Sequence, residues 1–471
     1  MARRVTRRAP GKLLVAGEYA VLEPGRPAVV VAVDRYVTVT AGDADGTVRT
    51  DHPAHPGSPA ETAGSAPCGD APASPGPGTA DVIVDSDLVG HEVGLRRTPE
   101  GLRVLPGQGF PATAAVPAVL AHVVSAVETV EALAEAAPVG RRPLGPAAVR
   151  LTIRSDLHDG GVKTGLGSSA AVTVATVRAL AEYHGTPLPD RECLRVALLA
   201  GVRVNAGPSG ADLAAAACGG WVAYRAPDRR ALLAGVRRDG VAATLAAPWP
   251  GFAVRPLPPP SGVTLHVGWS GSPASTPDLV AGLTAGPWWH SDARGRFLDD
   301  SEDCVTRMVR ALEDDRPADL LASVRTARRL LDRLDGEAAQ GVVTEPLRRL
   351  CEVAEACGAA AKPSGAGGGD CGIALLPGDG SAASAAPLHR RWREAGITPL
   401  PLAVAAGAGA ATAPAPAGPS APAAGSARPA LSARSAPSAG SARSAPRAEA
   451  HPAGTGPQAG LPSPTPRGRI R

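Results

Sequence analysis

Three lysines stand out in this chain of 471 residues, because the other 45 of its 48 basic residues are arginines. Lys12, Lys163 and Lys362 lie in APGKLLVAGEY, GGVKTGLGSSAA and AAKPSGAGGGDCG, each beside a glycine-bearing loop. Lysine is a compact point charge that arginine cannot always replace beside a phosphate. Unless this placement is chance, it indicates that the three segments handle phosphate groups.

The best candidate for a phosphate site is the segment GLGSSAA, which starts at Gly165. The apolar pattern that follows predicts a helix over 168–184, ended by Gly185 and Pro187. Backbone N–H groups and the hydroxyls of Ser168 and Ser169 would then stand at a helix N-terminus, where anions bind. The alternative is that one of these serines only caps the helix.

Two glycine patterns resemble dinucleotide-binding fingerprints, but their context does not fit. A polar loop with Lys163 precedes Gly165, where that fingerprint requires a strand. The second pattern, 367–372, runs into a predicted strand at 372–376, where the fingerprint requires a helix. The chain has no GxxxxGK[ST] motif, which excludes a P-loop.

The elements that must position these loops follow from hydrophobic periodicity and turn residues. In the first half we expect strands at 13–16, 27–40, 81–85 and 149–155, one or two helices within 112–137, helices at 168–184 and 190–201, and a strand in GGWVAY. In the second half we expect a strand at 263–269, two charged helices within 301–334, helices at 345–357 and 387–395, and strands at 372–376 and near Leu402. This order predicts an α+β fold with a boundary near residue 225.

Two segments are too poor in apolar side chains to form a core. Residues 405–471 are almost entirely Ala, Pro, Ser, Gly and Arg, and residues 51–79 contain no Val, Ile, Leu or aromatic residue. We predict a disordered tail and a flexible insertion.

Charge and cysteine content exclude several classes of protein. The net charge of +4 comes from the tail, because residues 1–404 carry 41 basic and 43 acidic groups, which argues against nucleic-acid binding. Seven cysteines without a CxxC motif favour a reduced, cytoplasmic chain. Apolar runs are too short for a membrane span, and the basic start is a poor signal peptide.

Three motifs in order, PGKLLVAGEYAVL, KTGLGSSAAVTVA and KPSGAGGGDCGIALL, resemble those of the GHMP kinase superfamily. Within it, GEYAVL, SGADLAAAACGGWVAY, VGWSGSPAST and GGGDCG are most similar to the bacterial and fungal phosphomevalonate kinase family. The resemblance covers residues 5–405 apart from 51–79.

This resemblance implies a two-domain fold: an N-terminal ATP-binding α/β domain over 1–225, with a left-handed βαβ unit, and a ferredoxin-like C-terminal domain over 226–404. It also implies transfer of the ATP γ-phosphoryl group to 5-phosphomevalonate with Mg²⁺, by a monomer or homodimer. Neither nucleic acid nor membrane is expected as a partner. Two alternatives stay open: a sibling kinase acting on mevalonate, homoserine or a sugar, and a non-catalytic metabolite-binding protein.

The resemblance also assigns roles to residues. Lys12 and Asp212 match catalytic positions. The ATP phosphates are assigned to Lys163, Gly165, Leu166, Gly167, Ser168, Ser169 and Ala170. The phosphorylated substrate is assigned to Lys12, Tyr19, Ser364, Gly365, Ala366 and Gly367.

The metal site departs from the mevalonate kinase pattern. Those enzymes place a Mg²⁺-binding glutamate eleven residues before the catalytic aspartate, where this chain has Gly201. This weakens the mevalonate kinase alternative and leaves Ser169 as the candidate protein ligand, with the metal held mainly by ATP phosphates and water.

Overall fold

The structure is a computed structural model that describes residues 3–45, 47–48, 79–87, 89–105, 119–136, 148–159 and 162–407. The predicted tail at 405–471 lies outside these residues from 408 onward, and the predicted insertion at 51–79 lies outside them except for Thr79. The described residues all belong to one compact unit.

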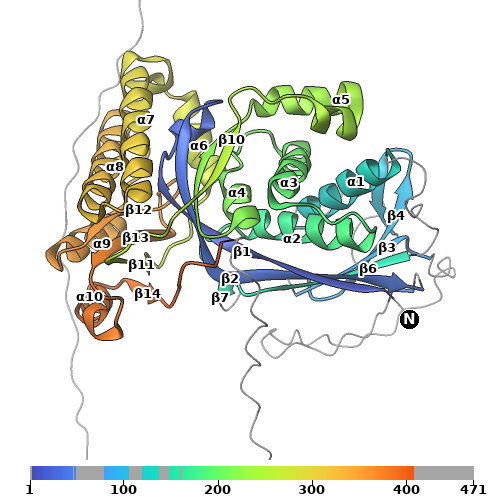
Figure 1. The fold of residues 1–471 in the computed structure, drawn as a ribbon, viewed down its shortest axis with the longest axis horizontal. Helices are drawn as coiled ribbons and strands as arrows, with labels where there is room; N and C mark the ends of the chain where they lie inside the picture. The colour runs from blue at the N-terminus through green and yellow to red at the C-terminus, as the bar shows by residue number, and fades with distance from the viewer. Residues whose placement is uncertain are drawn as a thin grey trace, which may run out of the picture. The chain divides into compact units, whose positions relative to one another are not determined.

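A mixed sheet of eight strands forms the base of the first half (Figure 1). Its strands are β1 (Arg4–Ala16), β2 (Pro27–Ala44), β3 (Val82–Ser86), β4 (Glu92–Thr98), β5 (Gly101–Val104), β6 (Ala148–Ser155), β9 (Trp221–Arg225) and β10 (Ala253–Leu257). The order is β10-β9-β2-β6-β3-β4-β5, with β1 paired to β2. β3 and β6 pair in parallel, and the other described pairs in this sheet are antiparallel.

Helices lie on one side of this sheet (Figure 1). They are α1 (Ala121–Glu135), α2 (Ser168–Tyr183), α3 (Asp190–Val204), α4 (Ala211–Cys218) and α5 (Arg229–Ala246). Helices α2 and α4 pack directly on β1 and β2, so their alanine- and valine-rich faces are buried. Two short strands, β7 (His158–Asp159) and β8 (Val162–Lys163), lead into α2.

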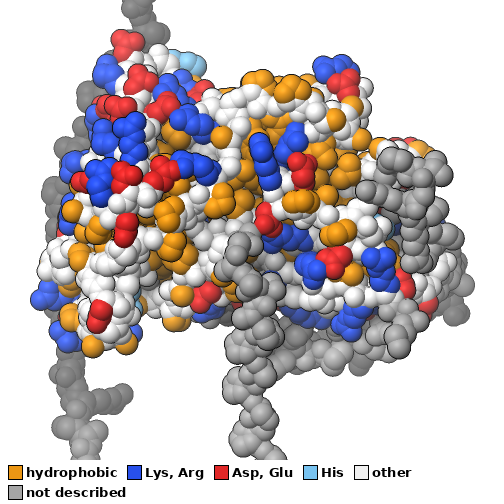
Figure 2. Space-filling view, viewed as in Figure 1, with side chains coloured by type: hydrophobic (Ala, Val, Ile, Leu, Met, Phe, Trp, Pro, Cys, Tyr) orange, Lys and Arg blue, Asp and Glu red, His pale blue; other side chains and the backbone are white. Residues whose placement is uncertain are grey.

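The second half builds a four-stranded antiparallel sheet in the order β12-β13-β11-β14. Its strands are β11 (Val263–Trp269), β12 (Ala360–Pro363), β13 (Cys371–Pro377) and β14 (Thr398–Leu400). The helices are α6 (Thr276–Ala285), α7 (Asp292–Glu313), α8 (Pro317–Ala338), α9 (Glu345–Ala356) and α10 (Ala382–Glu394), with a 3₁₀ turn at Pro287–His290. A further 3₁₀ turn, Ala20–Leu22, follows β1 in the first half. Charged side chains of both signs alternate over α7 and α8 (Figure 2), as their sequence pattern predicts.

The two halves share a continuous apolar core. Helices α7 and α8 contact β1, and α7 also contacts β2. The chain returns to the first sheet after β14, where the Ala405 N–H donates to the Ala32 carbonyl at 2.9 Å. The boundary near residue 225 stays a prediction: β9 ends at Arg225, but β10 still belongs to the first sheet. Among the described helices, none has the length and apolar character needed to cross a membrane.

Candidate active site

Lys12 connects the first strand to the serine-rich loop. It lies on β1 opposite Ala32, its backbone N–H donates to the Leu166 carbonyl at 2.8 Å, and its Nζ donates to the Gly165 carbonyl at 3.0 Å. Its stem also fills the space beside Gly167, where a Cβ would lie 2.9 Å from the Lys12 Cγ. The lysine is therefore held by its backbone and its side chain against the loop that precedes α2.

Helix α2 begins without a side-chain cap. Its N-cap is Gly167, in a left-handed conformation with φ 83°, and Ser168 and Ser169 are already helical. The alternative that one of these serines is only the N-cap does not describe this helix. Ser169 is exposed, so its hydroxyl and the first-turn N–H groups form an end that an anion can approach.

The third loop is attached to β1 and to the turn that follows it. The Ser364 hydroxyl accepts from the Leu14 N–H at 3.0 Å and donates to the Leu14 carbonyl at 3.1 Å. The Tyr19 hydroxyl donates to the Ala366 carbonyl at 2.5 Å. A Cβ built at Gly365 would lie 3.8 Å from the Lys12 Nζ, so this loop also reaches the lysine.

The two hydroxyls assigned to substrate thus have protein partners. Burial raises the pKa of Tyr19, with the negative charges of Glu18 and Asp335 acting in the same direction. Tyr19 therefore stays a neutral hydrogen-bond donor at physiological pH. Both hydroxyls fix the backbone of the third loop, whose Gly365 and Gly367 adopt φ values of 88° and 74°.

Asp212 stands in the first turn of α4, two residues after the N-cap Gly210, whose φ is 80°. A Cβ at Gly210 would come within 3.0 Å of the Tyr224 hydroxyl, so the close turn requires glycine. The half-buried carboxylate accepts from the Leu213 N–H at 2.9 Å, and α4 packs against β1 and α2. The catalytic role assigned to Asp212 stays a prediction.

Asp370 is a site residue that the sequence reasoning missed. Its Oδ1 accepts from the Ala274 N–H at 3.0 Å, and its side chain packs against Gly165. Burial raises the pKa of Asp370, against the opposing effects of the Ala274 hydrogen bond and of Lys12. The signal was available in the GGGDCG motif, where Asp370 is the one charged residue among glycines and a cysteine.

The three lysines do not share one role. Lys12 lies in the site, whereas the side chain of Lys163, on β8, falls outside the described part. Lys362 is fully buried and pairs with Glu18, so its side chain is enclosed in protein, already neutralised and not itself a phosphate ligand. Burial also raises the pKa of Cys371, the first residue of β13, to about 12, which keeps its side chain a thiol.

The donor set around the loops fits a metal held mainly by a substrate. Within the described residues, no group of three or more His, Cys, Asp and Glu side chains is arranged to hold a metal ion. Mg²⁺ commonly binds through substrate phosphates and water with one or two protein ligands. The exposed Ser169 hydroxyl at the α2 N-terminus is compatible with such a site.

Comparisons with known proteins agree with this arrangement. The GHMP kinases N terminal domain matches residues 122–220, and the GHMP kinases C terminal domain matches residues 315–396. A phosphomevalonate kinase of Streptomyces sp. (strain CL190) is 47% identical over 401 residues, covering 85% of this chain and 97% of the relative. A mevalonate kinase of Pyrococcus horikoshii is 29% identical over 226 residues, covering 46% of this chain and 57% of the relative.

A comparison with solved structures agrees with these sequence matches. The Streptococcus pneumoniae phosphomevalonate kinase in complex with phosphomevalonate and AMPPNP matches with a TM-score of 0.64 and 25% identity. The match covers 86% of this chain and 99% of that one. With the two-domain architecture, the three joined loops and the extent of these matches, the chain belongs to the GHMP kinases and, within them, to the phosphomevalonate kinase family.

Proposed function

We propose that this kinase transfers the γ-phosphoryl group of ATP to 5-phosphomevalonate, giving 5-diphosphomevalonate and ADP. An oxygen of the acceptor phosphate forms a new bond to the γ-phosphorus. The bond from that phosphorus to the β–γ bridging oxygen breaks, and ADP leaves with the electron pair. The second pKa of a phosphate monoester is about 6, so the nucleophile is already ionised at pH 7.

The observation that supports this function most strongly is the position of Lys12. Its Nζ hydrogen-bonds the loop at Gly165, and Gly365 of the third loop lies directly beside it. One cation therefore stands where the loop proposed for ATP meets the loop proposed for the acceptor. Phosphoryl transfer depends mainly on positioning and charge neutralisation, which such a cation provides.

The ATP phosphates are assigned to the α2 N-terminus. Backbone N–H groups from Gly165 to Ala170 would bind them, together with the hydroxyls of Ser168 and Ser169 and the charge of Lys163. Gly165 and Gly167 both have positive φ, which lets the backbone turn its N–H groups toward one side.

The acceptor is assigned to the third loop and to the turn that carries Tyr19. Because the hydroxyls of Tyr19 and Ser364 bond to backbone, we propose that they shape the acceptor site, while Gly365 and Gly367 present backbone N–H groups to the substrate. Lys12 would contact the phosphoryl group while it is being transferred. Asp212 would orient Lys12 and the acceptor phosphate, since no base is needed for an ionised nucleophile.

Mg²⁺ would accompany ATP, with Ser169 as its protein ligand. When bound, the ion neutralises charge on the β- and γ-phosphates. We also place the enzyme in the cytoplasm, because the six cysteines that the structure describes are all free thiols, which suits a reducing compartment.

Product identification tests the reaction. With Mg-ATP and 5-phosphomevalonate, ³¹P NMR should show the acceptor's single resonance replaced by two coupled resonances of a diphosphate. Retention of the monophosphate signal, with new phosphate on a hydroxyl instead, would contradict the proposal.

A further inference from the structure

A buried ion pair joins the turn after β1 to strand β12. Glu18 and Lys362 lie 344 residues apart in sequence, and the two residues are 4% and 0% exposed. The Lys362 Nζ donates to the Glu18 Oε1 and, at 2.5 Å, to the Pro363 carbonyl. The pair thus connects the first and third motifs from inside the protein.

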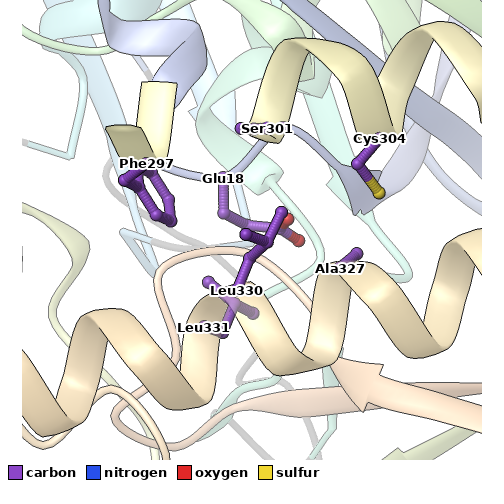
Figure 3. A pocket seen from close by; sticks show the side chains of 8 residues that line it. Glu18, Phe297, Ser301, Cys304, Ala327, Leu330 and Leu331 are labelled. Carbon is purple, nitrogen blue, oxygen red and sulfur yellow. The ribbon is translucent and has the colours of Figure 1, made fainter. Parts of the chain in front are cut away.

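The surroundings of the pair are mostly apolar. Glu18 points into a small cavity between α7 and α8 (Figure 3). The side chains around it belong to Phe297, Ser301, Cys304, Ala327, Leu330 and Leu331. Replacing such a pair by apolar residues is often neutral or stabilising, so stability gives little reason for placing two charges here. Removing one partner is different, because it leaves an unpaired buried charge.

The conformation of the neighbouring Tyr19 suggests why the ion pair is present. Tyr19, next to Glu18, has φ 61° and ψ −43°, a conformation that is costly for a bulky residue and persists only where its surroundings enforce it. On one side Glu18 is anchored to Lys362, and on the other the Tyr19 hydroxyl is anchored to the Ala366 carbonyl. Lys362 lies two residues before Ser364, whose hydroxyl bonds to Leu14 of β1.

We infer that Glu18 and Lys362 are positioning residues for the acceptor site: their ion pair fixes the strained Tyr19 turn and holds the loop 364–367 against β1. This inference rests on the proposed function, because it assigns that loop to the acceptor. The contacts of Lys12 with Gly165 and Leu166 tie the ATP loop to β1 independently of the pair. Loss of the pair should therefore weaken acceptor binding more than ATP binding.

Three variants test the inference: E18Q, K362M and the double variant E18Q/K362M. Each should raise the KM for 5-phosphomevalonate about tenfold and change the KM for ATP by less than about twofold. The double variant has no unpaired charge and should unfold at a higher temperature than K362M. Its acceptor KM should nevertheless stay high, since the connection between the motifs is still missing. If the pair had only a structural role, the double variant would instead regain both its unfolding temperature and its KM for the acceptor.

E131Q is a matched control. Glu131 on α1 is 8% exposed and forms a two-point ion pair with Arg97 on β4, the strand next to the edge strand β5 of the first sheet. It should lower the unfolding temperature without changing the ratio of the two KM values. Equal changes of both KM values in E18Q and K362M, or an acceptor KM restored in the double variant, would overturn the inference.

A measurement without turnover separates this inference from the proposed function. Amide hydrogen exchange at Leu14 and Gly368, whose N–H groups donate to Ser364 and Val342, reports how firmly the loop is held. Exchange should be faster in all three variants and unchanged in E131Q; unchanged exchange in the double variant would overturn the inference. If the wild-type enzyme phosphorylates another acceptor, the proposed function fails, and the same KM split is measured with that acceptor.

Discussion

The side chain of Asp370 occupies the space next to Gly165: a Cβ built on this glycine would lie 2.5 Å from the Asp370 Cγ. The loop before α2 and the loop before β13 therefore touch directly, although they come from different halves of the chain. Because Gly165 also accepts the hydrogen bond of Lys12, this contact fixes the loop on which the lysine rests.

Gly165→Ala should damage ATP binding specifically. The new Cβ would collide with Asp370, and the φ of 74° is unfavourable for alanine. We expect a rise of more than about tenfold in the KM for ATP, measured by initial rates. The matched control is Gly185→Ala, where φ is 84° but nothing lies within 4 Å. It should lose about 1 kcal/mol of stability and keep its KM. Similar kinetics for both variants would refute the collision argument.

Lys12→Met should lower kcat about 100- to 1000-fold, as expected when a group that stabilises transition-state charge is lost. Lys12→Arg should recover little of this loss, because the stem already fills the space beside Gly167 and a planar guanidinium cannot replace the point charge. Single-turnover rates at saturating substrates check both variants. A Lys12→Arg enzyme with wild-type kcat would contradict the role given to Lys12.

Asp212→Asn should lower kcat without adding a new pH requirement. The acceptor phosphate ionises with a pKa of about 6 and needs no base above that pH. The pH profiles of kcat for the variant and the wild type should therefore run parallel between about pH 7 and 9. Activity that returns only at high pH would show instead that Asp212 removes a proton.

Asp370→Asn should reveal how much free energy of folding is lost by burying this carboxylate. Burial raises its folded-state pKa above the ordinary value of 3.8, so the ionised form destabilises the folded protein at neutral pH. This cost decreases as the pH falls below the raised pKa, and it is gone below the ordinary value of 3.8. The asparagine oxygen can still accept the Ala274 hydrogen bond, and the variant has no such titration.

Urea unfolding at pH 7.5 and near pH 4.5 measures the effect. The free energy of unfolding of the wild type, minus that of Asp370→Asn, should become more positive at the lower pH. A difference that moves the other way would mean that the pairing of the ionised carboxylate with Lys12 outweighs its burial.

Local signals in the sequence were sufficient for much of the fold. The helix expected over 168–184 is α2, Ser168–Tyr183, because Gly167 starts it and Gly185 ends it. The strand expected at 263–269 is β11, and the glycine loop does enter a strand, Cys371–Pro377. Helix α5 was not expected, since Gly235 and Gly240 dilute its apolar pattern and Gly240 has a φ of 82°.

Long-range contacts were beyond sequence reasoning. The pairing of Lys362 with Glu18, and the contact of Asp370 with Gly165, depend on how the two sheets and their helices meet, which no local pattern encodes. The motifs located the loops correctly near Lys12. They could not show that the hydroxyls of Tyr19 and Ser364 bond to backbone, because those partners lie 347 and 350 residues away in sequence.

The most direct test of the central claim is ADP release by the purified enzyme with Mg-ATP and one of four acceptors: 5-phosphomevalonate, mevalonate, homoserine or galactose. We predict strong turnover with 5-phosphomevalonate alone, lost in Lys12→Met. Preferred turnover of mevalonate, homoserine or galactose would contradict the acceptor assignment while keeping a kinase. ATP binding without turnover of any acceptor would contradict catalysis itself and favour a metabolite-binding protein.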